Sequence, residues 1–297
     1  EAPRNALSSH PLASSGRERY HRAKCPNSPV ESPLRSPPVR PWKLAEPNYA
    51  ATKGRRFEVA VLPLGATEPH NLHLPYGMDL FEGDLIGEKI CEVAWQRGAK
   101  VMLLPTIPYG TQTNQRAFPF SMNVNPSTLG ALIGDLVESL VGQGILKIVL
   151  LNSHGGNDLK SVLREMYGKS PAKLVLCNWY QIFQDVYGEI FQESDDHAGE
   201  METSLALAYW PELVAKNPDG TLVADAGRKA TTRFEAVNRG WVSITRPWHL
   251  LTTNAGAGNP HAAKAEKGRR LVELLVDRLA TFLVELSAAE VDERFPY

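Results

Sequence analysis

The chain has 297 residues, of which 43% are hydrophobic, so it is long enough for one large domain with a substantial core. Its 32 Lys and Arg residues balance 33 Asp and Glu residues, which excludes the strong charge bias of proteins that bind nucleic acid or anionic membranes. No apolar run approaches the roughly 18 residues of a membrane span, no apolar stretch typical of a secretory signal opens the sequence, and the three cysteines are too widely spaced for a disulfide framework or a thiolate metal site. We therefore expect a cytoplasmic protein whose partner is a small molecule.

Residues 1–41 differ from the rest of the chain in composition. They are rich in Pro, Ser and Arg, as in Ser36-Pro37-Pro38, and have almost no apolar periodicity. Such a segment cannot bury enough surface to fold alone. We predict an N-terminal arm over residues 1–41, packed on the body or on a neighbouring subunit, and one folded domain over residues 42–297.

Short β-branched runs alternate with helical patterns from residue 59 onward. Strands are predicted at 59–64, 101–104, 148–151 and 174–177, and helices at 79–98, 126–142, 158–167 and 271–286. Asn125 is the expected N-cap of the second helix, because Pro126 suits the first helical position. Strands that alternate with helices indicate parallel pairing through right-handed crossovers. The predicted fold class is therefore α/β, a three-layer sandwich in which helices flank a mostly parallel sheet.

Polar residues that can bind metals follow these strands. Glu68, His70, His73 and Asp79 follow the first strand, His154 follows the third, Asn178-Trp179-Tyr180 follows the fourth, and Asp195-Asp196-His197 with Glu200 and Glu202 opens a later helix. Because ligands of parallel sheets bind beyond the carboxyl ends of the strands, we expect these residues to meet at one edge.

Imidazole and carboxylate groups together suit zinc, manganese or iron(II). The absence of nearby thiolates favours a catalytic site over a structural one. A carboxylate that bridges two ions would hold a water whose pKa falls to about 7, ready to attack a substrate. The pattern therefore indicates hydrolytic chemistry.

Each segment also has a simpler interpretation. His73 could support a ligand instead of binding metal itself, and the glycines after His154 could form a tight turn. Asp195 and Asp196 could lie in solvent near a helix N-terminus, which is the interpretation we prefer for Asp195. Their joint occurrence at strand ends favours the metal site.

Three motifs in the same order resemble the creatininase (creatinine amidohydrolase) family, over about residues 58–286. They are Glu68-x-His70-x-x-His73-Leu-Pro with Asp79, then Asn152-x-His154-Gly-Gly-Asn157, then His197-Ala-Gly-x-x-Glu202-Thr-Ser204. The resemblance implies a hydrolase of carbon–nitrogen bonds that acts on a small-molecule amide. It also implies two divalent ions per subunit, zinc, manganese or iron, and a homo-oligomer, a hexamer in creatininase relatives.

The resemblance also assigns roles by position. The metal ligands it implies are Glu68, His70, Asp79, His154 and Glu202, with Asp79 as the bridge between the two ions. His197 resembles the proton shuttle beside the bridging water. His73, Gly155, Gly156, Asn157 and Trp179 are expected to bind substrate or to support the ligands.

This chain departs from creatininase at several positions. Gly156 stands where creatininase has a glutamate ligand, so the resemblance leaves Glu202 to complete the second ion, whereas Glu200 is expected to be solvated. Creatininase has a substrate-covering Trp where this chain has Glu193, and the family's usual Gly is Asn71 and its common Glu-His is Asn114-Gln115 here.

We therefore expect hydrolysis of a non-peptide or cyclic amide by a metal-activated water, with a substrate other than creatinine. Formamide cleavage and the trimming of a modified peptide are alternatives known in the family. A non-catalytic relative that keeps the site for metal or ligand binding is a second hypothesis. A nucleotide-binding protein is disfavoured because no Gly-rich phosphate loop follows the first strand.

Overall fold

The computed structural model describes residues 39–297, with only the backbone of Asp195. All but the last three residues of the predicted N-terminal arm therefore lie outside the described part of the chain. The described part begins with a short extended segment in which Trp42 is buried and Leu103 donates its N–H to the Trp42 carbonyl at 2.7 Å.

The centre of the molecule is a parallel four-stranded sheet with the order β2-β1-β3-β4. The strands are β1 (Val59–Leu64), β2 (Val101–Leu103), β3 (Lys147–Asn152) and β4 (Lys173–Asn178). Each was predicted to within one residue at either end, because each is a short apolar run bounded by polar or turn-forming residues.

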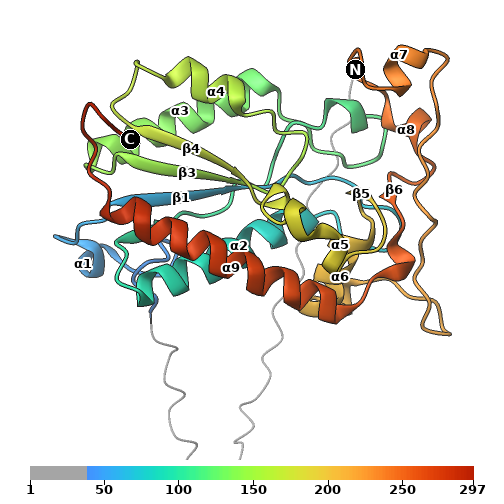
Figure 1. The fold of residues 1–297 in the computed structure, drawn as a ribbon, viewed down its shortest axis with the longest axis horizontal. Coiled ribbons are helices and arrows are strands. Elements are labelled where there is room, and N and C mark those ends of the chain that lie inside the picture. The colour runs from blue at the N-terminus through green and yellow to red at the C-terminus, as the bar shows by residue number, and fades with distance from the viewer. Residues whose placement is uncertain (1–38) are drawn as a thin grey trace, which may run out of the picture. The chain divides into compact units, whose positions relative to one another are not determined.

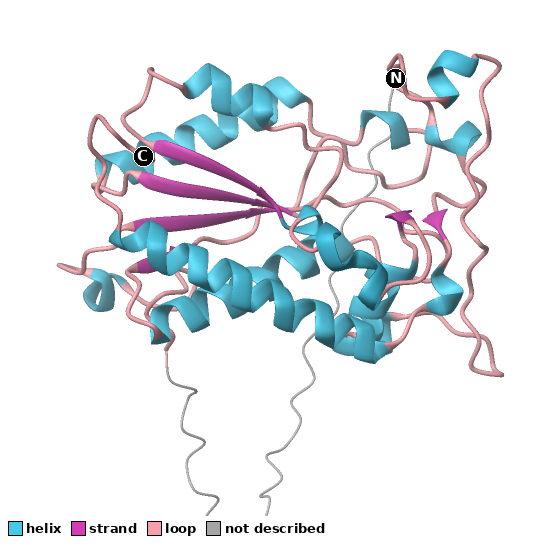
Figure 2. Cartoon of the chain, viewed as in Figure 1, coloured by secondary structure: helices cyan, strands magenta, loops and turns pink. Residues whose placement is uncertain are grey.

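Helices cover both faces of this sheet (Figures 1 and 2). Alternate β1 residues point to opposite faces. Val59 and Val61 pack in the same core cluster as α2 (Met78–Gln96) and α9 (Ala265–Ala288). Ala60 and Leu62 pack with α3 (Pro126–Gly142) and α4 (Lys160–Met166). The predicted α/β three-layer sandwich is confirmed.

Smaller elements lie beyond the carboxyl ends of the strands (Figure 1). They include α5 (Tyr187–Ile190), β5 (Asp195–His197), α6 (Glu200–Tyr209) and β6 (Ala257–Gly258), and β5 pairs antiparallel with β6. The remaining short helices are α1 (Tyr49–Thr52), α7 (Glu235–Asn238) and α8 (Trp248–Leu251). Among the described residues, none of the helices is both long and apolar enough to cross a membrane.

The start of α3 corrects one detail of the sequence prediction. Asn125 occupies the N-cap position and Pro126 the first helical position, as expected. The Asn125 side chain, however, accepts no hydrogen bond from the helix. Its Oδ1 instead accepts from Asn123 Nδ2 at 3.3 Å, so a neighbouring side chain holds it away from the helix amides.

The strand order also tells where a ligand can bind. The chain crosses from β1 to β2 on one side and later returns past β1 to β3 on the other. In such sheets the crevice opens beyond the carboxyl ends of the two strands at which the direction reverses. These strands are β1 and β3, which lead directly to Glu68 and His154.

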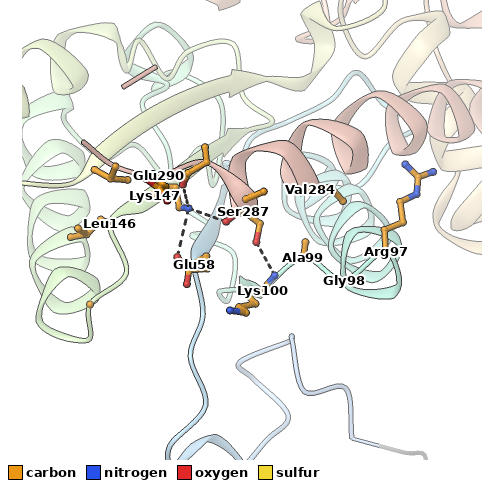
Figure 3. A pocket seen from close by; sticks show the side chains of 14 residues that line it. Glu58, Arg97, Gly98, Ala99, Lys100, Leu146, Lys147, Val284, Ser287 and Glu290 are labelled. Carbon is orange, nitrogen blue, oxygen red and sulfur yellow. Dashed lines mark hydrogen bonds and ion pairs between the residues drawn. The ribbon is translucent and has the colours of Figure 1, made fainter. Parts of the chain in front are cut away.

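A cleft of about 560 Å³ opens at the opposite edge, at the amino end of β3 (Figure 3). Its most buried cation is Lys147, which is only 3% exposed. The Lys147 ammonium donates to the Ser287 and Ala289 carbonyls at 3.0 and 2.7 Å and lies 3.6 Å from Glu58 Oε2. Lys147 therefore satisfies carbonyls at the C-terminal end of α9, a structural role.

Lys147→Met should destabilise the fold by about 1–3 kcal/mol, because the Ser287 and Ala289 carbonyls would lose the donor that they share. Metal content should not change, since the metal-ligand candidates lie at the other edge. Urea unfolding monitored by circular dichroism, with elemental analysis of the same samples, measures both. Lys100→Met is the matched control, because Lys100 lines the same cleft but is exposed. Equal stability of the two variants would contradict this role.

Candidate metal centre

Six buried side chains meet beyond the carboxyl ends of β1 and β3. They form three overlapping groups in which one nitrogen or oxygen of each residue lies within 4.8 Å of the others, namely Glu68–His70–His197, Glu68–Asp79–His154 and His70–Asp79–Glu202. The structure thus brings together all five residues expected to bind metal, and the expected proton shuttle with them.

The loop after β1 supplies the first two. Glu68 is held by its N–H, which donates to the Tyr76 carbonyl at 3.1 Å, and by the Gln115 side-chain amide, which donates to Oε2. His70 Nδ1 donates to the Glu68 carbonyl at 3.0 Å, because a carbonyl can only accept. This bond leaves His70 Nε2 to face Asp79, whose Oδ1 lies 3.2 Å away.

His154 follows β3 and faces the same carboxylates. Its Nε2 donates to the Thr111 carbonyl at 3.0 Å, so its Nδ1 points inward. That nitrogen lies 2.9 Å from Glu68 Oε1 and 3.1 Å from Asp79 Oδ2. Asp79, in the first turn of α2, therefore has one oxygen beside His70 and the other beside His154. This is the arrangement that a bridging carboxylate requires.

The last two side chains come from the segment that joins β5 to α6. His197 Nε2 donates to the Pro69 carbonyl at 2.9 Å, which turns its Nδ1 toward Glu68 Oε1 at 3.7 Å. Glu202 lies in the first turn of α6, and its Oε2 accepts from the Ala198 N–H. All three imidazoles thus donate one N–H to a backbone carbonyl and turn the other nitrogen to the cluster, as metal-binding histidines do.

The electrostatics of the cluster fit a cation. Burial raises the pKa of Glu202 to about 7, and the nearby carboxylates of Asp79 and Glu68 contribute to the increase. Burial opposes protonation of His70, yet the Asp79 carboxylate raises the pKa of His70 to about 10. Three buried carboxylates at this spacing require compensating positive charge. Two divalent ions would supply it with ligands that zinc, manganese and iron(II) accept.

A cavity of about 160 Å³ opens onto these residues. Its wall includes Trp179, as expected, and Tyr180, which was expected at the same edge of the sheet. Phe183 and Tyr187 also line it and were not predicted to do so. Among the described residues, Trp179 Nε1 and Ser153 Oγ are buried and have no hydrogen-bond partner. Both residues line the cavity, and buried donors are rarely left unpaired.

Of the other residues expected to bind substrate or support the ligands, one lines the cavity and two are buried outside its wall. Gly155 lines the cavity. His73 and Asn157 are buried but are not among the cavity-lining residues. His73 Nε2 lies 2.7 Å from Thr203 Oγ1, and burial lowers the pKa of His73 to about 4. Asn157 Oδ1 accepts from the Thr111 N–H at 2.9 Å, so Asn157 fixes the loop whose carbonyl orients His154.

Two departures from the family pattern have a local explanation. Gln115 stands in place of the family's histidine, and its side-chain amide donates to Glu68 Oε2. Asn71 stands where a glycine is usual and has a φ of 53°, a conformation that asparagine tolerates better than most residues. Its side chain donates to the Asp225 carbonyl at 3.2 Å.

The expectation for Glu200, at the start of α6, is wrong. Glu200 was expected to be solvated, because it stands two residues before Glu202 and points elsewhere. It does point elsewhere, but it is 0% exposed and forms an ion pair with Lys267 of α9. The sequence alone did not show that α9 would pack against this face of α6.

Gly156 has no room for a side chain. A Cβ at this position would lie 2.2 Å from the Thr111 carbonyl oxygen and 2.4 Å from His154 Nε2. The glutamate that creatininase has here could not be accommodated in this backbone conformation. The expected use of Glu202 in its place is therefore consistent with the local packing.

Gly156→Ala should force the Thr111 loop and the His154 ring apart and break the hydrogen bond that orients His154. Because such outer contacts affect metal affinity by about 10–100-fold, we expect a loss of that size for one ion. Isothermal titration with Mn²⁺ measures it. Gly155→Ala is the matched control, since a Cβ there meets open space. Parental affinity in Gly156→Ala would contradict the argument.

The fold and the cluster together define an α/β protein with a buried carboxylate–imidazole site that could hold divalent metal ions. The chain belongs to the creatininase family, whose model, described as creatinine amidohydrolase, matches residues 43–283. The matched region contains every residue of the cluster.

Several known proteins are similar to this chain. Creatinine amidohydrolase of Pseudomonas putida is 31% identical over 194 residues, 58% of this chain and 71% of that protein. The 3-dehydro-scyllo-inosose hydrolase of Thermotoga maritima is 26% identical over 82% of this chain and 80% of its own length. A solved Bacteroides fragilis structure, described as that of a candidate creatinine amidohydrolase, is 35% identical, with a TM-score of 0.77 over 84% of this chain and 98% of that one.

Proposed function

We propose that this protein is a metal-dependent amidohydrolase that cleaves the C–N bond of a small non-peptide or cyclic amide. The observation that carries the proposal is the buried cluster in which Asp79 lies between His70 and His154 while three histidines are oriented by backbone carbonyls. The similarity to a creatinine amidohydrolase and to a 3-dehydro-scyllo-inosose hydrolase supports it.

Glu68, Asp79 and His154 would hold one ion, and His70, Asp79 and Glu202 the other. Two ions bound there would activate a water as the nucleophile and polarise the carbonyl of the amide. Solved creatininase structures of the same fold include a manganese form and a zinc–zinc form, which favours these metals here.

His197 would move the proton in this reaction. Its Nε2 donates to the Pro69 carbonyl, so Nδ1 is the nitrogen free to accept a proton and to pass it to the leaving nitrogen. The His197 ring is held between His70, at a centroid distance of 4.2 Å, and Trp248, at 5.0 Å. Burial lowers the pKa of His197, which favours the neutral form that accepts the proton.

The cavity supports a small substrate. Its volume of about 160 Å³ is below the roughly 300 Å³ at which drug-sized ligand pockets begin. The unpaired Trp179 Nε1 would donate a hydrogen bond to a carbonyl or ring acceptor of the substrate.

The homo-oligomer and the cytoplasmic location remain predictions. Light scattering of the purified protein tests the predicted homo-oligomer.

The test is elemental analysis of the purified protein together with a screen of cyclic amides, formamides and short peptides. We expect about two metal ions per chain and cleavage of at least one small amide, lost on chelation and restored by added Mn²⁺ or Zn²⁺. A protein that holds both ions but cleaves none of the three classes would favour the second hypothesis, a non-catalytic binding protein.

A further inference from the structure

Glu200 is a fully buried carboxylate that joins three parts of the chain. Its Oε2 accepts from the N–H groups of Gln192 and Glu193 at 2.8 and 2.7 Å. Its Oε1 forms an ion pair with the Lys267 ammonium, which also donates to the Ala262 carbonyl at 3.0 Å. The loop before β5, the start of α6 and the start of α9 therefore meet at this one side chain.

The contact between the Glu193 N–H and the Glu200 carboxylate brings the two ends of the segment 193–200 together. The segment contains His197, and Glu202 follows it by two residues. Within it, Ala198 has a φ of 53°, which a β-carbon makes unfavourable, so surrounding contacts must impose it. The Ala198 N–H is the group that donates to Glu202. The closure at Glu200 thus fixes the backbone that orients Glu202.

A second set of contacts fixes α6 against α9. The Ser204 hydroxyl donates to the Glu200 carbonyl at 2.6 Å and accepts from the Lys264 N–H at 3.1 Å. Gly268 allows the close approach, because a Cβ there would lie 2.2 Å from the Ser204 carbonyl oxygen. Lys267 therefore cannot move away from Glu200 without separating the two helices.

We infer that Glu200, anchored by Lys267, is a positioning residue that holds Glu202 and His197 at the metal centre through the amides of Gln192 and Glu193. The inference rests on the proposed function, since it takes Glu202 as a metal ligand. A buried ion pair contributes little net stability compared with an apolar pair of the same size. What the pair provides here is a fixed place for the 193–202 segment.

The test compares metal binding in four variants. Glu200→Ala removes both amide contacts and the ion pair. The double variant Glu200→Gln with Lys267→Met removes the ion pair and the Lys267 contact with the Ala262 carbonyl. It keeps the amide contacts, because the amide oxygen of glutamine still accepts from both N–H groups. Glu202→Gln removes the ligand itself. Glu266→Gln is the control, since Glu266 is an exposed residue of α9 that pairs with the exposed Arg269. The metal-free proteins are titrated calorimetrically with Mn²⁺, and their melting temperatures are recorded without metal.

We expect Glu200→Ala to weaken one of the two ions by about 10–100-fold and to leave the other unchanged. The double variant and Glu266→Gln should bind both ions as the parent does. Where Glu200→Ala fails to fold, Glu200→Asp supplies the test, because its shorter side chain keeps the charge but cannot reach the amides.

Parental binding of both ions by Glu200→Ala and Glu200→Asp, with only their melting temperatures lowered, would show a purely structural role and overturn the inference. If Glu202→Gln loses an ion and these two variants do not, the inference alone fails. If Glu202→Gln itself keeps both ions, the ligand assignment in the proposed function fails as well.

Discussion

Asp79→Asn should remove both metal ions and reduce turnover by at least about a thousandfold, since neither an activated water nor a polarised carbonyl would remain. Asp79 has one oxygen 3.2 Å from His70 Nε2 and the other 3.1 Å from His154 Nδ1. Burial alone would raise the pKa of Asp79, but His70 and His154 hold it well below its ordinary value, so it stays ionised. An amide of the same shape lacks the charge that a bridge between two cations requires.

Elemental analysis and the rate on the amide found in the screen measure this prediction, with circular dichroism to show that the variant folds. Asp84→Asn is the matched control, because Asp84 lies on the same helix but is exposed and accepts from the Thr106 hydroxyl. If Asp79→Asn still held two ions, Asp79 would not be the bridge.

Glu202→Gln should lose one ion only and lower turnover by at least about a hundredfold, the range typical of disabling an activated nucleophile. Glutamine can still accept the Ala198 N–H, so the start of α6 should keep its conformation. Burial raises the pKa of Glu202 to about 7, which shows how unfavourable this buried charge is without a cation beside it. Removing the charge therefore removes a reason for the second ion to bind, while Glu68, Asp79 and His154 still hold the first.

Metal stoichiometry and rate are compared for Glu202→Gln, the parent and a control, Glu212→Gln, in which an exposed glutamate is changed. A Glu202→Gln protein with one ion and a reduced rate fits the assignment. Full occupancy at the parental rate would remove Glu202 from the site.

The strands and long helices could be predicted because each carries its own signal. β1 and β3 are unbroken apolar runs, and the apolar stripe of α9 recurs at helical spacing. The position of Glu68 and His154 could be predicted as well, since residues directly after parallel strands share one edge of the sheet. Local patterns thus determined most of the fold and placed the cluster.

What the sequence did not reveal depends on contacts between distant segments. The Thr111 carbonyl orients His154 from 43 residues away, and Lys267 reaches Glu200 from 67 residues away. Glu200 was expected to be solvated because it stands two residues from Glu202 and therefore points away from the metal ligands. No periodicity in either segment indicates these partners.

The region between α6 and β6 was also beyond prediction. Its contacts centre on Asp225, whose carboxylate accepts from Asn254 Nδ2 at 2.7 Å and from the Gly227 N–H at 2.8 Å. These are loop contacts with no repeat along the chain. The same region contains Trp248, whose ring contacts that of His197. This aromatic contact was not predicted from the sequence.

The attachment of α9 at both ends has a consequence for how the protein is made. Lys147 holds the C-terminal end of this helix at one edge of the sheet, and Glu200 holds Lys267 near its start at the other. During translation the sheet can form before α9 leaves the ribosome, because all four strands precede it in the chain. If Glu200 positions the 193–202 segment as inferred, the backbone around His197 and Glu202 would reach its final shape only once α9 docks, and a metal ion would bind there only after α9 has been made.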